Sequence, residues 1–206
     1  MEYMTKAEVK PHRQEFKNII DSIRRDIRNE GITFTYTLIG SAKRNLVLRH
    51  HNKGYDCDYK ITIQKNINNV KEKELKQMFM DAFNKVIVPM GYNHCEDSTQ
   101  AITMKKVVEK ESKIEKGYDV IITKDLDDGT HILRNDKNKR GNVYHYVQMK
   151  DTQNFYYNYA QIKGSKMWED LREKYKKKRE DNENLPEEKQ KKGFQLLSDT
   201  VNELIN

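Results

Sequence analysis

Cysteine and long apolar runs are both scarce in this sequence, and each scarcity excludes a class of protein. The 206 residues contain two cysteines, Cys57 and Cys95. With no sign of export, two small buried thiols are expected rather than a disulfide. No apolar stretch approaches the roughly 20 residues that a membrane span needs. The N-terminal stretch MEYMTKAEVKPHRQ lacks the apolar core of a signal peptide, so the chain is expected to be cytoplasmic, with no membrane partner.

Charged residues are abundant, and they indicate the kind of partner. They make up 34% of the chain against 35% hydrophobic residues, and apolar periodicity runs through most of the sequence, which predicts a folded protein. The 39 Lys and Arg exceed the 32 Asp and Glu, which gives a formal net charge of +7. This balance favours polyanionic partners such as nucleotides, nucleic acid or acidic surfaces. A Lys- and Asn-rich solvated surface produces the same balance.

The apolar periodicity predicts an α+β protein rather than regular βαβ alternation. Helices are predicted over 12–29 and within 68–92, strands over 32–40, 57–64, 100–108 and 118–124, then a hairpin around DKNKRG, and finally helices over 165–181 and 187–205. This order predicts a sheet-containing domain over residues 1–150 and a helical segment over residues 151–206 that packs on it.

Three aspartates stand at the start of predicted strands. Asp56 and Asp58 flank a cysteine, and residues two apart in a strand point to the same face. Asp119 opens the later strand YDVIIT, so all three carboxylates converge if the two strands are neighbours in one sheet. Clustered carboxylates repel one another unless cations neutralise them, and Mg²⁺ prefers hard oxygen ligands of this kind.

A Gly-Ser pair follows the first predicted strand. Gly40 would let the backbone approach a phosphate closely, and Ser41 would add a hydroxyl and an amide donor. Lys43 and Arg44 come next, where cations could meet a triphosphate. A solvated face explains these two cations equally well, so the residues alone leave both interpretations open.

A plainer interpretation exists for the acids as well. Asp56 and Asp58 would then be two solvated carboxylates at a strand start, and Asp119 a residue favoured by the preceding turn. The combination of three strand-borne acids with the Gly-Ser pair favours a metal site over that interpretation.

The segments LIGSAKRN, YDCDYKI and GYDVIIT together resemble the nucleotidyltransferase superfamily typified by DNA polymerase β. The shared pattern is a hydrophobic strand, Gly-Ser, a short helix, Asp-x-Asp on the next strand and a third Asp on a later strand. After the third acid, DGTHILRN and the aromatic-containing NVYHY resemble the oligoadenylate-synthase and cyclic-dinucleotide-synthase branch. The resemblance spans residues 12–150 and implies a mixed central sheet flanked by helices, with a short C-terminal helical appendage.

The resemblance also implies roles for individual residues. Gly40 and Ser41 match the phosphate-binding pair, with Lys43 or Arg44 assisting. The matching metal ligands are Asp56, Asp58 and Asp119. Asp119 matches the carboxylate that helps activate the acceptor hydroxyl. Tyr144 is the candidate for stacking on a base, and Tyr146 is an equal alternative.

The implied activity is transfer of a nucleoside monophosphate from an NTP, with ATP favoured, to an acceptor hydroxyl, with Mg²⁺ or Mn²⁺ as cofactor and pyrophosphate as product. The aromatic hairpin and the positive charge favour a nucleotide or RNA as acceptor. The alternative is a non-catalytic nucleic-acid-binding or toxin–antitoxin-type partner protein that retains the fold. The helical segment over residues 151–206 is shorter than the helical domain usual in that branch. A homodimer or a helical partner protein is therefore expected to supply what this segment lacks.

Overall fold

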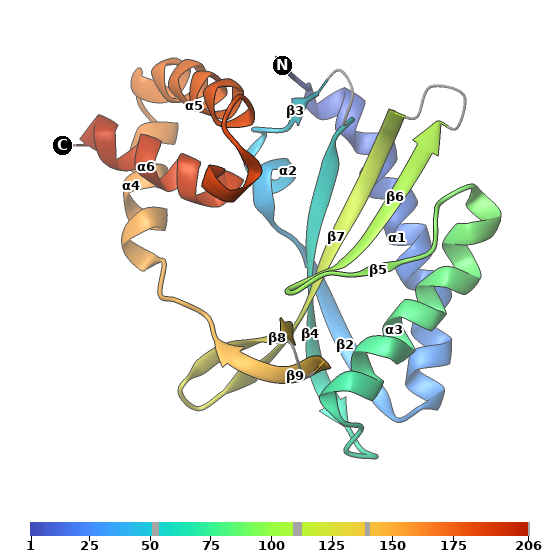
Figure 1. Cartoon of the computed structure of the whole chain (residues 1–206). Coiled ribbons are helices and arrows are strands. Elements are labelled where there is room, and N and C mark those ends of the chain that lie inside the picture. The colour runs from blue at the N-terminus through green and yellow to red at the C-terminus, as the bar shows by residue number, and fades with distance from the viewer. Residues whose placement is uncertain (51–53, 109–112, 139–140, 206) are drawn as a thin grey trace. The chain divides into compact units, whose positions relative to one another are not determined.

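The computed structural model describes residues 1–50, 54–108, 113–138 and 141–205. The chain divides into two compact units, one over Glu2–Met149 and the other from Lys150 onward together with Met1 (Figure 1). The functions expected of the two parts, and the expected packing of one on the other, stay predictions. Among the described residues, no helix is long and apolar enough to cross a membrane.

The larger unit contains a mixed sheet of seven strands. The strands of this unit are β1 Glu2–Tyr3, β2 Ile32–Leu38, β3 Leu48–Arg49, β4 Asp56–Asn66, β5 Glu96–Asp97, β6 Ile102–Val108, β7 Lys113–Leu126, β8 Gly129–Asn138 and β9 Gly141–Gln148. The order in the main sheet is β2-β4-β7-β6-β5, with β8 paired to β7 and β9 paired to β8, while β1 and β3 form a separate pair. Strands β4 and β7 are parallel and the other neighbours are antiparallel. The predicted fold class is therefore confirmed.

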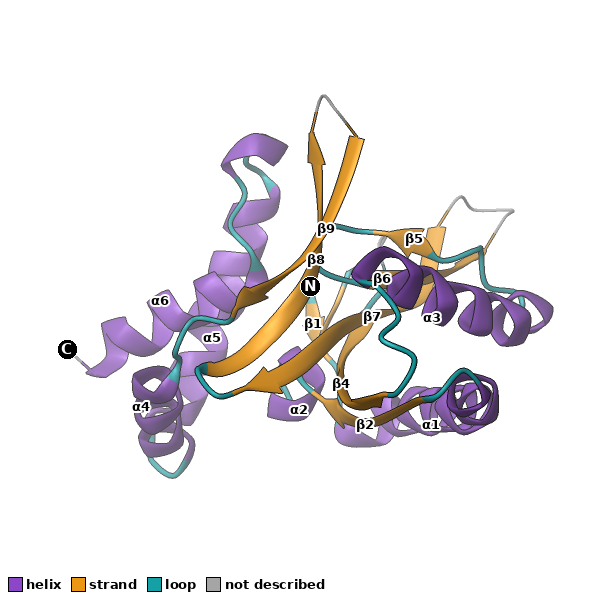
Figure 2. Cartoon of the chain, turned by 90° about the horizontal axis from the view of Figure 1, so that it is seen from below, coloured by secondary structure: helices purple, strands orange, loops and turns teal. Residues whose placement is uncertain are grey.

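Two long helices cover one face of this sheet, as Figures 1 and 2 show. They are α1 (Lys6–Asn29) and α3 (Glu72–Ile87), and a short helix α2 (Gly40–Arg44) follows β2. The apolar stripe of α1 is fully buried against the sheet, and Phe16 stacks on Tyr59 of β4 with ring centroids 3.6 Å apart. This burial of aromatic and β-branched side chains stabilises the unit.

Helix α1 begins earlier than the predicted residue 12. A capping box starts it at Thr5: the Thr5 hydroxyl accepts from the Glu8 N–H at 3.3 Å, and the Glu8 carboxylate accepts from the Thr5 N–H at 2.8 Å. Pro11 lies inside the helix. The two satisfied N–H groups at the cap stabilise this early start.

The smaller unit consists of helices α4 (Gln153–Lys163), α5 (Met167–Glu183) and α6 (Gly193–Ile205), with a 3₁₀ turn at Glu187–Lys189. Helix α4 was not predicted, because Asn and Tyr have low helix propensity. The signal present was the helical spacing of Phe155, Tyr159 and Ile162, all of which are buried. Helix α6 begins later than the predicted residue 187, close to the point where its buried apolar residues start.

A buried histidine on α1 lies behind the strand that carries the paired acids. The exposed fraction of His12 is 2%, its ring is 4.1 Å from that of Tyr118, and its Nδ1 is 3.5 Å from the Cys57 sulfur. Both cysteines are free thiols. Burial, and to a lesser degree the Lys116 ammonium, lowers the pKa of His12 from 6.5 to about 3.

This histidine should make the fold sensitive to acid. Between pH 6.5 and 3, His12 is protonated in the unfolded chain but neutral in the folded chain. The free energy of unfolding therefore falls as the pH falls. The slope from one such group is about 1.4 kcal/mol per pH unit. Urea unfolding of the wild type and of His12→Gln between pH 7 and 4.5 should show a shallower slope in the variant. His94→Gln, at an exposed histidine, is the control and should keep the wild-type slope. Equal slopes in all three proteins would contradict the prediction.

Candidate functional site

Parallel pairing of β4 and β7 brings three carboxylates together. In this register Asp58 lies directly opposite Asp119, and Asp56 precedes Asp58 by two residues on the same face. One carboxylate oxygen from each aspartate lies within 4.8 Å of the other two. The structure therefore brings together the three acids that the sequence singled out, while their metal-binding and catalytic roles stay predictions.

The carboxylates lie on the face of the sheet that α1 and α3 leave uncovered. Side chains alternate along each strand, so the residues next to the acids point the other way. Tyr59 on β4 and Tyr118 on β7 are buried in the core, while Asp58 and Asp119 are partly exposed. The core beneath the acids is thus packed, and the acids themselves face outward from it.

The Gly-Ser pair contacts Asp58 directly. Gly40 has φ +64, and a Cβ placed on it would lie 1.7 Å from Asp58 Oδ2, so only glycine leaves room for this carboxylate. The Ile39 N–H donates to the Asp58 carbonyl oxygen at 2.9 Å, and the Ser41 N–H donates to the Asp58 carboxylate. Gly40 and Ser41 therefore lie in direct contact with the acid cluster.

The two cations after the Gly-Ser pair have different environments. Arg44 has an exposed fraction of 8%, and its guanidinium donates to the Gly40 carbonyl oxygen at 2.8 Å. Lys43 is exposed on α2. Arg44 therefore stabilises the turn from inside, and Lys43 is the cation that is accessible beside it.

The acids repel one another, and this repulsion changes the proton affinity of the central one. Burial raises the pKa of Asp58 to about 7, and the carboxylates of Asp56 and Asp119 act in the same direction. The Ser41 N–H and the Arg44 guanidinium oppose the shift. Three hard oxygen donors that resist joint ionisation fit a divalent cation, which would remove the repulsion.

A threonine that the sequence did not single out holds Asp119. Thr103 of β6 lies opposite Asp119 in register, and its hydroxyl donates to Asp119 Oδ1 at 2.6 Å. The Thr103 oxygen lies 3.1 Å from the Ser98 hydroxyl. Only the pairing of β6 with β7 makes Thr103 a neighbour of Asp119, and no motif in the sequence records that pairing.

Neither aromatic of the hairpin lies at the carboxylates. Tyr144 and Tyr146 of β9 pack against the helix-covered core on the other face of the sheet. The Tyr144 hydroxyl donates to Asp97 Oδ2 at 2.6 Å and accepts from the Asn135 amide at 3.2 Å. The Lys124 ammonium lies 3.9 Å from the centre of the Tyr146 ring. The register of the hairpin turns both rings toward α3, so the structure does not place either one to stack on a base beside the acids.

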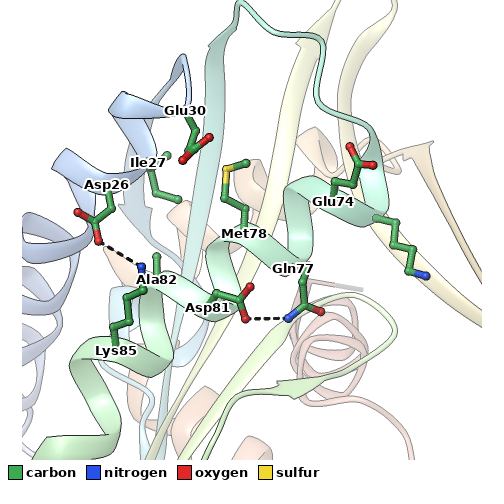
Figure 3. A pocket seen from close by; sticks show the side chains of 10 residues that line it. Asp26, Ile27, Glu30, Glu74, Gln77, Met78, Asp81, Ala82 and Lys85 are labelled. Carbon is green, nitrogen blue, oxygen red and sulfur yellow. Dashed lines mark hydrogen bonds and ion pairs between the residues drawn. The ribbon is translucent and has the colours of Figure 1, made fainter.

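A surface groove lies between α1 and α3, on the opposite side of the sheet from the acids. Figure 3 shows its lining, which includes Asp26, Glu30, Glu74 and Asp81 together with Met78. Its predominantly acidic rim does not favour the phosphates of a nucleotide. The groove is therefore separate from the candidate site.

Comparison with solved structures finds the fold in a bacterial protein. The Vibrio cholerae protein DncV bound to 3′-deoxy ATP superimposes with a TM-score of 0.61 at 16% identity, over 99% of this chain and 53% of DncV. Its GTP-bound form gives 0.59 at 18% identity, over 99% and 53%. Its complex with the linear intermediate 5′ pppA(3′,5′)pG gives 0.58 at 16% identity, over 98% and 56%. No protein-family model matches the sequence, and no curated protein matches it.

These similarities establish the nucleotidyltransferase-type fold of this chain and, at such low identity, the fold alone. The resemblance that the sequence motifs predicted is confirmed at that level. The chain spans about half the length of DncV.

The contact between Gly40 and Asp58 can be tested by adding one methyl group. Gly40→Ala should lower the free energy of unfolding by about 2 to 4 kcal/mol, because the new Cβ must displace the Asp58 carboxylate and also adopt a left-handed backbone. Gly91→Ala is the matched control: its φ is +83, but the nearest atom, Lys106 Cε, is 3.7 Å away. The control should cost about 1 kcal/mol, the backbone penalty alone. Equal losses in urea unfolding would show that the close approach to Asp58 has no energetic consequence.

Proposed function

We propose that this chain is a metal-dependent nucleotidyltransferase that moves a nucleoside monophosphate from an NTP to an acceptor hydroxyl and releases pyrophosphate. The observation that carries the proposal is the convergence of three carboxylate oxygens within 4.8 Å, next to the Gly40–Ser41 turn. The shared fold with DncV, which binds nucleotides, supports it.

Asp56, Asp58 and Asp119 would hold the metal ion, Mg²⁺ or Mn²⁺. When bound, such an ion neutralises phosphate charge and favours ionisation of the attacking hydroxyl. The protein's own contribution begins with holding the three carboxylates together despite their repulsion. A cation that binds there would remove this repulsion and favour the ionised form of Asp58. Asp119, at the edge of the cluster nearest β6, orients the acceptor hydroxyl and helps remove its proton.

The turn after β2 would hold the phosphates of the NTP. Gly40 keeps this turn in a left-handed conformation against Asp58, and the Ser41 hydroxyl and nearby backbone N–H groups donate to phosphate oxygens. Lys43 is the exposed cation beside this turn and pairs with a phosphate. Arg44 keeps the turn in shape through the Gly40 carbonyl oxygen. Catalysis then consists of positioning the reactants and neutralising charge.

A nucleotide is the acceptor we favour over RNA, with ATP as donor. DncV, described as a cyclic AMP-GMP synthase, has been captured with the linear intermediate 5′ pppA(3′,5′)pG, in which one nucleotide has accepted another. This chain spans about half of DncV. The activity that we propose for it is a single transfer step.

Incubation with each α-labelled NTP and Mg²⁺ or Mn²⁺ tests the proposal. Pyrophosphate release should fall by about a hundredfold or more in Asp56→Asn, Asp58→Asn and Asp119→Asn, because each change removes a charge that holds the reacting groups. Product masses identify the acceptor. Asp81→Asn on α3 is the matched control, since this acid is exposed, lies on the opposite side of the sheet from the three aspartates and accepts a hydrogen bond from the Gln77 amide.

The same variants separate a functional site from a structural one. Asp58→Asn removes the charge that repels Asp56 and Asp119, so the melting temperature of this variant without metal should equal or exceed that of the wild type. Unchanged turnover in the aspartate variants, or turnover that persists after chelation of the metal, would refute the proposal. No turnover with any of the four NTPs, and no thermal stabilisation by Mg²⁺ with NTP, would favour a binding protein instead.

A further inference from the structure

Asp119 is tied to the neighbouring strand by a short hydrogen bond. The Thr103 hydroxyl donates to Asp119 Oδ1 at 2.6 Å across the β6–β7 ladder. An ionised carboxylate has only acceptor sites, so the single proton of the Thr103 hydroxyl is committed to Asp119. Hydrogen bonds to charged groups are shorter and stronger than neutral ones. This bond therefore restricts the direction in which the Asp119 carboxylate points.

The position of the Thr103 hydroxyl is itself restricted. With its proton given to Asp119, the Thr103 oxygen accepts from the Ser98 hydroxyl at 3.1 Å. Ser98 lies in the turn between β5 and β6, where its N–H donates to the Ala101 carbonyl oxygen at 3.1 Å and the Glu96 carbonyl oxygen at 3.2 Å. The donor that supports Thr103 is therefore part of a hydrogen-bonded turn.

A buried ion pair anchors that turn. The Lys76 ammonium, on α3, has an exposed fraction of 2% and donates to the Ser98 carbonyl oxygen at 2.6 Å. It also pairs with Asp97 Oδ1 at 2.6 Å, while Asp97 Oδ2 accepts from the Asn135 amide at 2.8 Å and from the Tyr144 hydroxyl. Lysine is almost never buried without such partners. The network joins α3, β8 and β9 to the turn that carries Ser98.

The hydrogen bond from Thr103 acts against the repulsion among the carboxylates. The carboxylates of Asp56, Asp58 and Asp119 repel one another, and a side chain free to rotate would turn Asp119 away. Loss of the Thr103 hydroxyl would remove the bond that resists this rotation. The metal-binding arrangement of oxygens would then form less often before a cation arrives, so the cation would bind more weakly.

We propose that Thr103 is a positioning residue for Asp119. Its hydroxyl keeps the carboxylate directed toward Asp56 and Asp58, and the Ser98 turn, anchored by Lys76 and Asp97, keeps the hydroxyl in place. This inference rests on the proposed function of the acid cluster as a metal site.

The test is titration of the full chain with Mn²⁺ alone, following free Mn²⁺ by electron paramagnetic resonance. Thr103→Val keeps the shape of the side chain without the hydroxyl and should weaken Mn²⁺ binding by about tenfold. Thr103→Ser keeps the hydroxyl and should bind Mn²⁺ nearly as the wild type does. Thr130→Val is the matched control: the Thr130 hydroxyl donates to Asp125 Oδ1 at the same 2.6 Å on the exposed β7–β8 turn, and its loss should leave Mn²⁺ affinity unchanged.

The same substitution made in the Asp119→Asn variant distinguishes a positioning role of Thr103 from a general distortion of the site. If Thr103 acts through Asp119, adding Thr103→Val to Asp119→Asn should cause no further loss of Mn²⁺ affinity. Wild-type affinity in Thr103→Val, or the same loss in both backgrounds, would overturn the inference. Should Thr103→Val fail to fold by circular dichroism, Ser98→Ala, which removes the donor to Thr103, takes its place with the same expectation of weakened binding.

Turnover and metal binding distinguish the two proposals. A wild type that binds Mn²⁺ but neither consumes any NTP nor is stabilised by Mg²⁺ with NTP refutes the proposed function, and the Mn²⁺ comparison still decides the role of Thr103. A wild type that turns over NTP, with Thr103→Val equal to it in Mn²⁺ affinity and in kcat, refutes the positioning role alone. A wild type that binds no Mn²⁺ refutes both.

Discussion

Parallel pairing of β4 with β7 places Asp58 opposite Asp119, and the candidate site depends on this contact. Parallel neighbours need a long connection between them, and here it contains α3 and the β5–β6 hairpin. Helices α1 and α3 bury the aromatic and branched residues of one face. The opposite face is thereby available for polar residues, and the alternation of side chains along β4 and β7 fills it with carboxylates.

Burying these carboxylates together has an electrostatic cost: burial first, and then the charges of Asp56 and Asp119, raise the pKa of Asp58. The surrounding structure reduces that cost without removing it: a glycine makes room for Asp58, the Ser41 N–H donates to it, and Thr103 donates to Asp119. Hydrophobic packing alone would not select such an arrangement, because apolar residues on this face would fold without the repulsion. Three carboxylate oxygens held together in this way are a donor set that could hold a divalent cation, as proposed above.

The β8–β9 hairpin contributes Tyr144 to the polar network around Asp97 and Lys76. Tyr144 is the residue that the family resemblance assigned to base stacking, yet its hydroxyl donates to Asp97 on the helix-covered face. Hydrogen bonds and an ion pair connect it through Asp97, the buried Lys76 and the Ser98 turn to the threonine that contacts Asp119. The same fold in DncV, at 16 to 18% identity, shows that the architecture tolerates very different sequences.

The sequence by itself determined the elements and the acids: apolar periods of 3.6 and 2 located most helices and strands, and local motifs identified Gly40, Ser41 and the three aspartates. It could not determine which strands pair or in what register, because pairing depends on contacts far apart along the chain. Only the tertiary structure decided that Arg44 points inward, that Tyr144 faces α3 and that Thr103 lies against Asp119. A one-residue shift in the hairpin would have turned Tyr144 to the other face, and no feature of NVYHY specifies that register.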